Sequence, residues 1–175
     1  VDSHYKDGRA GWFDEIECIA INDSSARMNA LMTGQLDAVN RVDFKTEPLL
    51  RANPNIEIFE VTGNMQYTFP MLTNQAPFDD GNVRKALKYG VNRQEMVDKI
   101  LQGHGMVGND HPIGPANQYL ATDIPQTEFD IDKAKFYMKA AGLTELNVDL
   151  SASDAAFNGA VDASQLYQAS AKNAG

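Results

Sequence analysis

The sequence has almost no cysteine and no long apolar run, and both absences limit what the chain can be. Cys18 is the single cysteine among 175 residues, so no disulfide can form within the chain, and cysteine usage does not indicate a cellular compartment. No apolar run approaches the roughly 18 to 20 residues that a membrane-spanning helix needs, so we expect no membrane span. No basic start followed by a short apolar stretch marks a signal peptide, but the chain begins at Val1 rather than Met, so this absence does not indicate where the parent protein goes.

Clustered positive charge is also missing. The chain has 15 Lys and Arg against 24 Asp and Glu, which gives a formal net charge of −9 at pH 7. A nucleic-acid surface needs clustered basic side chains that displace counterions from phosphates. We therefore expect no nucleic-acid partner, whereas a small-molecule ligand fits this composition.

No motif of catalysis is present either. The chain has no G-x-S-x-G elbow, and we expect Cys18, which lies in the apolar run 16–21, to be a buried core thiol rather than a nucleophile. Asp79 and Asp80 are better explained as helix caps than as an acid/base pair. The sequence therefore predicts a protein that is not an enzyme.

Two patterns resemble cofactor or metal sites but fail on their context. Residues 103–108 match G-x-G-x-x-G, but they follow a predicted helix and open a Pro-rich loop, whereas a dinucleotide site needs a strand that turns into a helix. His104, Asp110 and His111 have no metal-ligand spacing. We expect neither a cofactor nor a metal.

Hydrophobic periodicity predicts an alternation of strands and helices. Strands are expected at 15–21, 36–39, 56–61, 65–73 and 146–150. Helices are expected after the turn and cap residues 22–24, Asp79–Asp80, Asn92 and Asp130, and over 44–51 and 157–174. Residues 104–127 form a long loop with no sustained period. This order predicts an α/β fold with helices packed on a sheet.

Three segments, in this order, resemble one protein family. Residues 24–37 look like a helix that ends in a Gly-x-x-Asp turn into a strand. Residues 77–93 contain P-F-D-D, then V-R-K-A-L, then N-R, with an extra residue near Gly81 and Asn82. Residues 129–143 contain F-D, K-A and A-G-L, and Gly114-Pro115 lies between these segments. The combination is similar to bacterial extracellular solute-binding proteins of family 5, the peptide/opine/nickel class.

This resemblance implies a periplasmic-binding-protein-like (type II) two-lobe clamshell that the chain covers only in part. Residues 1–63 would end the first lobe and residues 64–175 would begin the second, with a hinge crossing near 61–67. The protein would be the periplasmic, extracytoplasmic binding component of an ATP-driven importer. Its partners would be a peptide or related small solute and the membrane permease subunits of that importer.

The resemblance also implies where the ligand binds. Arg41 would pair with a ligand carboxylate, Tyr67 and Phe69 would provide apolar walls, and Asp110 would receive a ligand ammonium. The complete set of expected ligand-binding residues is Asn40, Arg41, Val42, Tyr67, Thr68, Phe69, Asn109, Asp110 and His111. Each of these residues could instead have only a local structural role.

Two other function classes stay open at this point. A small α/β enzyme, either a hydrolase or a transferase, would need a catalytic site that the sequence does not display. A non-catalytic protein-interaction module would need no ligand cleft. Within the favoured class, the sequence does not separate a peptide from an opine or a nickel chelate.

Overall fold

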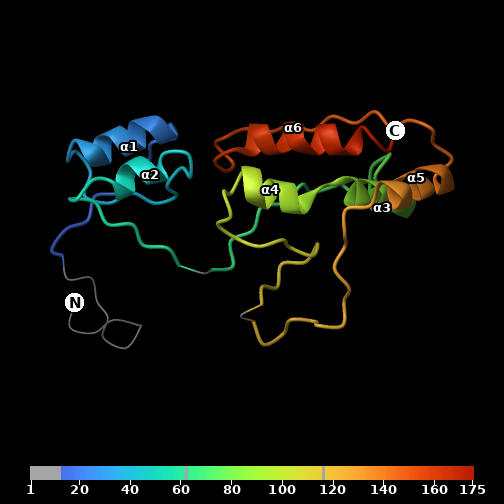
Figure 1. Ribbon diagram of the computed structural model, residues 1–175, viewed down its shortest axis with the longest axis horizontal. Helices are drawn as coiled ribbons and strands as arrows, with labels where there is room; N and C mark the ends of the chain where they lie inside the picture. Colours follow the sequence, from blue (N-terminus) through green and yellow to red (C-terminus); the bar gives the residue numbers. More distant parts are fainter. Residues whose placement is uncertain (1–12, 62, 116) are drawn as a thin grey trace. The chain divides into compact units, whose positions relative to one another are not determined.

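The computed structural model describes residues 13–61, 63–115 and 117–175. The chain divides into two compact units, one ending at Val39 and the other beginning at Asn40. The first unit contains helix α1, Ser24–Met32, and the second contains the five helices α2 to α6 (Figure 1). Their bounds are Glu47–Arg51 for α2, Gly81–Gly90 for α3, Arg93–Lys99 for α4, Ile131–Ala140 for α5 and Ala160–Ala171 for α6.

Helix α1 has the start and the end that its sequence predicts. The Asp23 side chain accepts a hydrogen bond from the backbone N–H of Ala26 at 2.7 Å, which satisfies one of the unpaired donors of the first turn. Met28 and Ala30 are buried. Gly34 follows the helix in the left-handed conformation, with φ of 73°, where glycine has no steric penalty.

Helices α3 and α5 form the centre of the second unit. Asp80 caps α3 by accepting from the N–H of Asn82 at 2.7 Å, and Asp130 caps α5 by accepting from the N–H of Lys133 at 2.9 Å. The two helices pack against each other through buried small and aliphatic side chains. These side chains are Val83 and Ala86 on α3 and Ala134 and Met138 on α5. The predicted caps at Asp80 and Asp130 are confirmed.

Helix α6 docks on α3 through a close backbone approach and two hydrogen bonds. A Cβ atom built on Gly90 would lie 3.6 Å from the Cα atom of Ala171, which is an ordinary van der Waals contact, so the two helices meet closely at this point. The hydroxyl of the buried Ser170 donates to the carbonyl of Gly90 at 2.9 Å. The hydroxyl of Tyr167 donates to the carbonyl of Leu87 at 3.0 Å.

Three predicted helices are present but shorter than expected. The helix expected over 44–51 begins only at Glu47, because residues 44–46 form a turn and Pro48 fits the first turn of a helix. Asn92 caps α4 as predicted, by accepting from the N–H of Glu95 at 3.1 Å, but α4 ends before Gly103. The helix expected over 157–174 begins at Ala160, after Gly159 with φ of 84°.

The five predicted strands are not formed within the residues that the structure describes, where no strand is assigned. A strand exists only when its backbone groups pair with a neighbouring strand, and these segments find no such partner there. The α/β class is therefore not confirmed by the structure, which is helical. The loop at 104–127 has no helix or strand among its described residues, as predicted.

The expectation of a buried Cys18 was wrong, because its thiol is free and exposed. Cys18 lies in one of the unpaired segments, where Ile16 and Ile19 are also exposed, and an apolar run is buried only when another element covers it. Among the helices that the structure describes, none is long and apolar enough to cross a membrane. The hinge near 61–67 and the lobe boundary at 63–64 stay predictions.

Candidate functional site

Arg41 lies in a turn with an uncommon backbone conformation. Its φ is 55°, in the left-handed region, where a side chain with a Cβ atom costs roughly 1–2 kcal/mol. Asp110, a second predicted site residue, has φ of 59°. Strained residues of this kind are found at functional sites more often than elsewhere, so both positions are candidates on the basis of backbone geometry.

A short segment before α6 brings the two halves of the predicted site together. The ring of Phe157 stacks on the ring of Tyr67, with centroids 4.1 Å apart and an interplanar angle of 18°. The side-chain amide of the next residue, Asn158, donates to the backbone carbonyl of Arg41 at 3.3 Å. Tyr67 and Arg41 thus contact two adjacent residues, Phe157 and Asn158, and Arg41 is exposed.

Phe69 continues this aromatic cluster toward α6. Its ring packs on that of Tyr167 at a centroid distance of 5.3 Å and an angle of 60°. Burial raises the pKa of Tyr167 to about 12, the Arg93 charge opposes this rise, and the Asp110 charge adds to it. The Tyr167 hydroxyl is thus a hydrogen-bond donor at neutral pH, and it lies within electrostatic reach of Arg93 and Asp110.

Asp110 already has two cationic partners. The guanidinium of Arg93 donates to the Asp110 carboxylate at 2.8 Å, and the ammonium of Lys88 lies 3.6 Å from it. Arg93 also donates to the carbonyl of Lys88 at 2.9 Å, which fixes the guanidinium between α3 and the loop. A ligand ammonium at Asp110 would replace the longer contact with Lys88 rather than meet an unpaired carboxylate.

Asn109 forms hydrogen bonds between the middle of the 104–127 loop and its end. Its amide donates to the carbonyl of Pro125 at 3.0 Å, and its side-chain oxygen accepts from the N–H of Thr127 at 2.9 Å. The amide of Gln126 adds a hydrogen bond to the carbonyl of Gly108 at 3.1 Å. Asn109 therefore orders the loop, and its side-chain polar groups are engaged in doing so.

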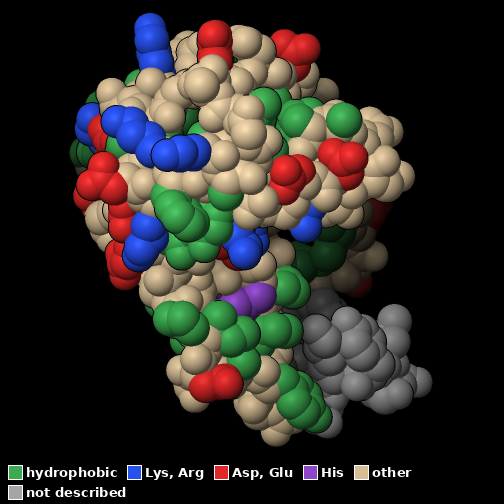
Figure 2. Space-filling view, turned by 90° about the vertical axis from the view of Figure 1, so that its right-hand side faces the viewer, with side chains coloured by type: hydrophobic (Ala, Val, Ile, Leu, Met, Phe, Trp, Pro, Cys, Tyr) green, Lys and Arg blue, Asp and Glu red, His purple; other side chains and the backbone are tan. Residues whose placement is uncertain are grey.

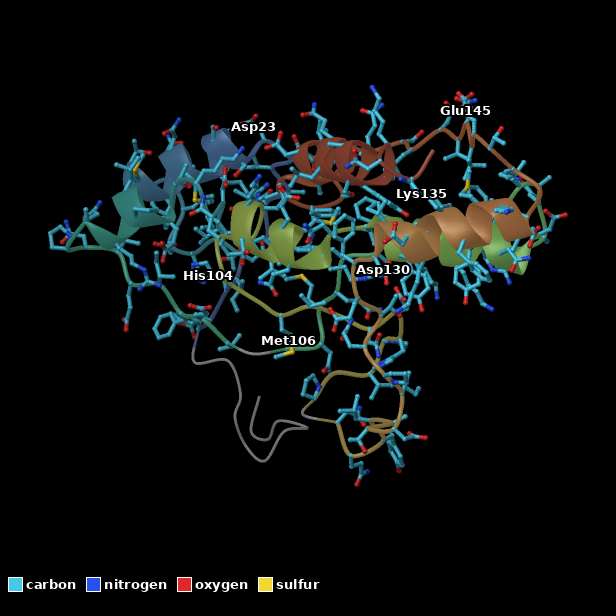
Figure 3. All side chains as sticks on the ribbon, turned by 45° about the vertical axis from the view of Figure 1, so that its right-hand side comes forward. Asp23, His104, Met106, Asp130, Lys135 and Glu145 are labelled. Atoms are coloured by element: carbon cyan, nitrogen blue, oxygen red, sulfur yellow. The ribbon has the colours of Figure 1, made fainter. Side chains whose placement is uncertain are left out.

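The loop is also attached at its beginning, at His104 (Figure 3). The His104 ring stacks on Phe44 with centroids 4.9 Å apart, and its Nδ1 atom lies 2.9 Å from the Glu60 carboxylate. The hydrogen bond and charge of His104 hold the pKa of Glu60 below its ordinary value. This contact ties the loop to the segments on either side of α2.

The remaining predicted site residues make fewer contacts with the other described residues. Asn40 and Thr68 are exposed, and Val42 and His111 are half-buried. The Nδ1 atom of His111 is buried and has no hydrogen-bond partner among the described residues. The structure therefore places Arg41 and Tyr67 against residues 157–158, Phe69 against Tyr167 of α6, and Asn109 to His111 in the loop beside α3 and α4.

Phe157 and Asn158 were missed by the sequence reasoning. They were included in a predicted helix, although Gly159 next to them is a signal that a helix starts later. No sequence pattern indicates that they meet residues 67 and 41. Within residues 13–61, 63–115 and 117–175, no group of three or more His, Cys, Asp or Glu side chains could hold a metal ion.

Comparison with known proteins gives one family and a set of curated relatives. The family described as bacterial extracellular solute-binding proteins, family 5 Middle, matches residues 2–175. The glutathione-binding protein GsiB of Salmonella typhi is 29% identical over 129 residues, which is 74% of this chain and 25% of that protein. GsiB of Escherichia coli (strain K12) gives the same identity and the same coverage. The chain thus spans about a quarter of the length of these relatives.

Proposed function

This chain belongs to the bacterial extracellular solute-binding proteins of family 5, and on that premise we propose that the whole protein captures a peptide-like solute outside the cytoplasm. It delivers the solute to the permease subunits of an ATP-driven importer and catalyses no reaction itself. The family match over residues 2–175 is the observation that carries this proposal.

The proposed fold of the whole protein is the type II clamshell of two lobes, with the ligand in the cleft between them. Residues 61–67 cross from one lobe to the other, so that Arg41 and Tyr67 approach the cleft from the two sides of the crossing. The bridge that Phe157 and Asn158 make between these two residues supports this placement. A ligand enclosed from both lobes loses its water, which strengthens each polar contact that it makes.

The proposed ligand carries both a carboxylate and an ammonium group. The exposed guanidinium of Arg41 can donate two parallel hydrogen bonds to a carboxylate. Tyr67 and Phe69 form an apolar wall beside it, and Asp110 receives the ammonium in place of Lys88. Peptides and glutathione, the ligand in the name of the relatives, have both groups. The other proposed contacts come from Asn40, Val42, Thr68, Asn109 and His111.

Isothermal titration of the full-length protein tests this proposal. We expect a peptide or glutathione to bind, and Arg41→Ala to weaken binding by at least about tenfold, the loss expected for a charged hydrogen bond to a carboxylate. Arg51→Ala is the matched control, because Arg51 is exposed and forms its ion pair with Glu47 on the same helix.

Three results would contradict the proposal at different levels. Tight binding of a carboxylate ligand that Arg41→Ala leaves unchanged would remove Arg41 from the site. Binding of nickel chelates alone would overturn the ligand class. Hydrolysis of a peptide or ester by the purified protein would overturn the assignment as a binding protein.

A further inference from the structure

The residues that lead into α6 and its first turn contact the stretch that begins at Arg41 twice. We call these residues, 157–162, the α6 start. The side-chain amide of Asn158 donates to the backbone carbonyl of Arg41 at 3.3 Å. The ammonium of Lys45 donates to the carboxylate of Asp162 at 2.9 Å. Each contact joins residues that are 117 positions apart in the sequence, so both tie residues 41–45 to the α6 start.

Residues 41–45 lead directly into a hydrogen-bonded turn. The backbone N–H of Lys45 donates to the Asp43 carboxylate at 3.0 Å, and the N–H of Glu47 donates to the Asp43 carbonyl at 3.0 Å. Only Val42 lies between this turn and Arg41, whose backbone has the left-handed φ of 55°. A contact at Lys45 therefore restrains the conformation of Arg41 as well.

The other end of α6 is attached to α3 independently of these two contacts. The hydroxyl groups of Tyr167 and Ser170 donate to the carbonyls of Leu87 and Gly90. The helix has 12 residues, and both of these contacts lie in its second half. The α6 start is thus the end of a helix that α3 already holds.

Capping of α6 does not require the side chains of Asn158 and Asp162. The N-cap is Gly159, and the Asp154 carboxylate accepts from a backbone N–H of the first turn at 3.2 Å. Asp162 lies in the first turn, where a carboxylate favours the helix, but it also pairs with Lys45, which is outside the helix. The hydrogen bond and charge of Asp162 raise the pKa of Lys45.

From these contacts we infer that the α6 start positions Arg41 for the carboxylate of the solute, with Asn158 and Asp162 as positioning residues. The inference rests on the proposed role of Arg41 in solute binding. Asn158 acts on the backbone of Arg41, and Asp162 acts through Lys45. A guanidinium makes two parallel hydrogen bonds to a carboxylate only in a defined orientation, so a less restrained turn binds the solute more weakly.

The effect of the ion pair is local. The Lys45 and Asp162 side chains are 65% and 48% exposed. Acidic and basic side chains both lie on the face of the molecule in Figure 2, and exposed charges act over about 8 Å at physiological ionic strength. Removal of one exposed carboxylate therefore acts mainly on its direct partner.

A double-mutant cycle in the full-length protein tests the inference by isothermal titration with glutathione and with trialanine. We expect Asp162→Asn to weaken binding by about two- to fivefold, the range for an exposed ion pair. In an Arg41→Ala background the same substitution should have no effect, because Asp162 acts through Arg41. Asp132→Asn is the matched control, because it makes the same change of charge in the first turn of α5.

Two further variants separate positioning from a general loss of stability. Lys45→Asp places two carboxylates together and should weaken binding more than Asp162→Asn, whereas adding Asp162→Lys to it restores an ion pair and should recover most of the loss. Asn158→Asp removes the donor to the Arg41 carbonyl and should weaken binding by about two- to tenfold, the range for one hydrogen bond. Urea unfolding of each variant measures whether the fold is retained.

The outcomes distinguish this inference from the proposed function. An equal loss from Asp162→Asn with and without the Arg41 side chain would show an effect of α6 stability alone, and would overturn the inference while Arg41 keeps its proposed role. Unchanged affinity in both Asp162→Asn and Asn158→Asp would overturn it in the same way. If the wild-type protein bound neither glutathione nor trialanine, the proposed function would be contradicted and the inference overturned with it.

Discussion

The backbone conformation of Arg41 affects the stability of the protein independently of ligand binding. Because the left-handed conformation of Arg41 penalises any side chain with a Cβ atom, Arg41→Gly should be more stable than Arg41→Ala by about 1 kcal/mol. Both variants lose the guanidinium and should lose ligand affinity equally. Urea unfolding measures the difference in free energy, and titration with ligand measures affinity.

The contrary result would be informative. If Arg41→Ala is as stable as Arg41→Gly, the turn relaxes without the arginine, and the conformation is not imposed by its surroundings. In that case the hydrogen bond from Asn158 to the Arg41 carbonyl would not be what holds the turn.

A second prediction at the scale of single residues concerns Asp130 and the pH dependence of stability. The hydrogen bond from the Lys133 N–H, together with the Lys133 charge, lowers the pKa of Asp130 below its ordinary value of 3.8. Because the folded state holds the proton more weakly than the unfolded state, the stabilisation is fully present above 3.8 and is lost as pH falls through the lowered value.

The variant that isolates this effect is Asp130→Asn. Asparagine caps a helix about as well as aspartate at neutral pH but does not titrate, so the loss of stability on acidification should be smaller in this variant. Asp132→Asn changes the same charge in the same turn without touching the cap. Urea unfolding from neutral pH to below 3.8 measures the difference, and identical pH profiles for wild type and Asp130→Asn would refute it.

At the scale of elements, the start of α6 depends on Gly159. This residue has φ of 84°, and a Cβ atom here would lie only 2.8 Å from the Cγ2 atom of Ile100. Gly159→Ala should therefore lower the free energy of unfolding by about 2 kcal/mol, from backbone strain and overpacking together. Calorimetric or urea unfolding of the full-length protein measures this loss.

Gly108→Ala is the matched control for this substitution. A Cβ atom on Gly108 has no neighbour within 4 Å, and its φ is not in the left-handed region. The change there should stay within about 0.5 kcal/mol. If Gly159→Ala is equally mild, α6 can begin without the left-handed residue, and the segment with Phe157 and Asn158 is less constrained than its contacts indicate.

The elements that sequence reasoning predicted are those that local contacts decide. The caps Asp80, Asn92 and Asp130 each accept from a backbone N–H two or three residues ahead, so residue type and spacing are sufficient to find them. Strands need partners at a distance in the sequence, and the five predicted segments have none within the part of the chain that the structure describes.

In the candidate site, too, the sequence predicts some residues but not the long-range contacts that they make. Arg41, Tyr67 and Phe69 were predicted from a family resemblance, and that they are ligand contacts stays a prediction. The hydrogen bond to the Arg41 carbonyl comes from Asn158, which is 117 residues away in sequence and follows the Phe157 ring that stacks on Tyr67. Hydrophobic periodicity does not predict such a contact, because it joins residues that are far apart in the sequence.

At the scale of the whole molecule, the unpaired segments predict how this chain behaves when it is produced alone. Phe59, Val61 and Met65 are 78%, 84% and 66% exposed, in a stretch with strand-like sequence and no ladder partner among the described residues. Exposed apolar side chains beside unpaired backbone groups form an edge that pairs with another chain. We therefore expect residues 1–175 to self-associate as concentration rises, as measured by light scattering after size-exclusion chromatography.

Lysine placed in this stretch should prevent the association, because charged side chains on an edge oppose pairing with another edge. Phe59→Lys with Val61→Lys is the test variant. Phe136→Lys is the control, since it removes an equally apolar side chain that is 64% exposed on α5, away from the unpaired stretch.

In the full-length protein, the clamshell proposal predicts that Phe59 and Val61 are covered by the rest of the protein. The wild-type protein should therefore stay monomeric, and Phe59→Lys with Val61→Lys should lower its free energy of unfolding. A monomeric 1–175 chain at every concentration would show that the segment is shielded within the chain itself, and full-length stability unchanged by the two lysines would show that the rest of the protein does not cover it.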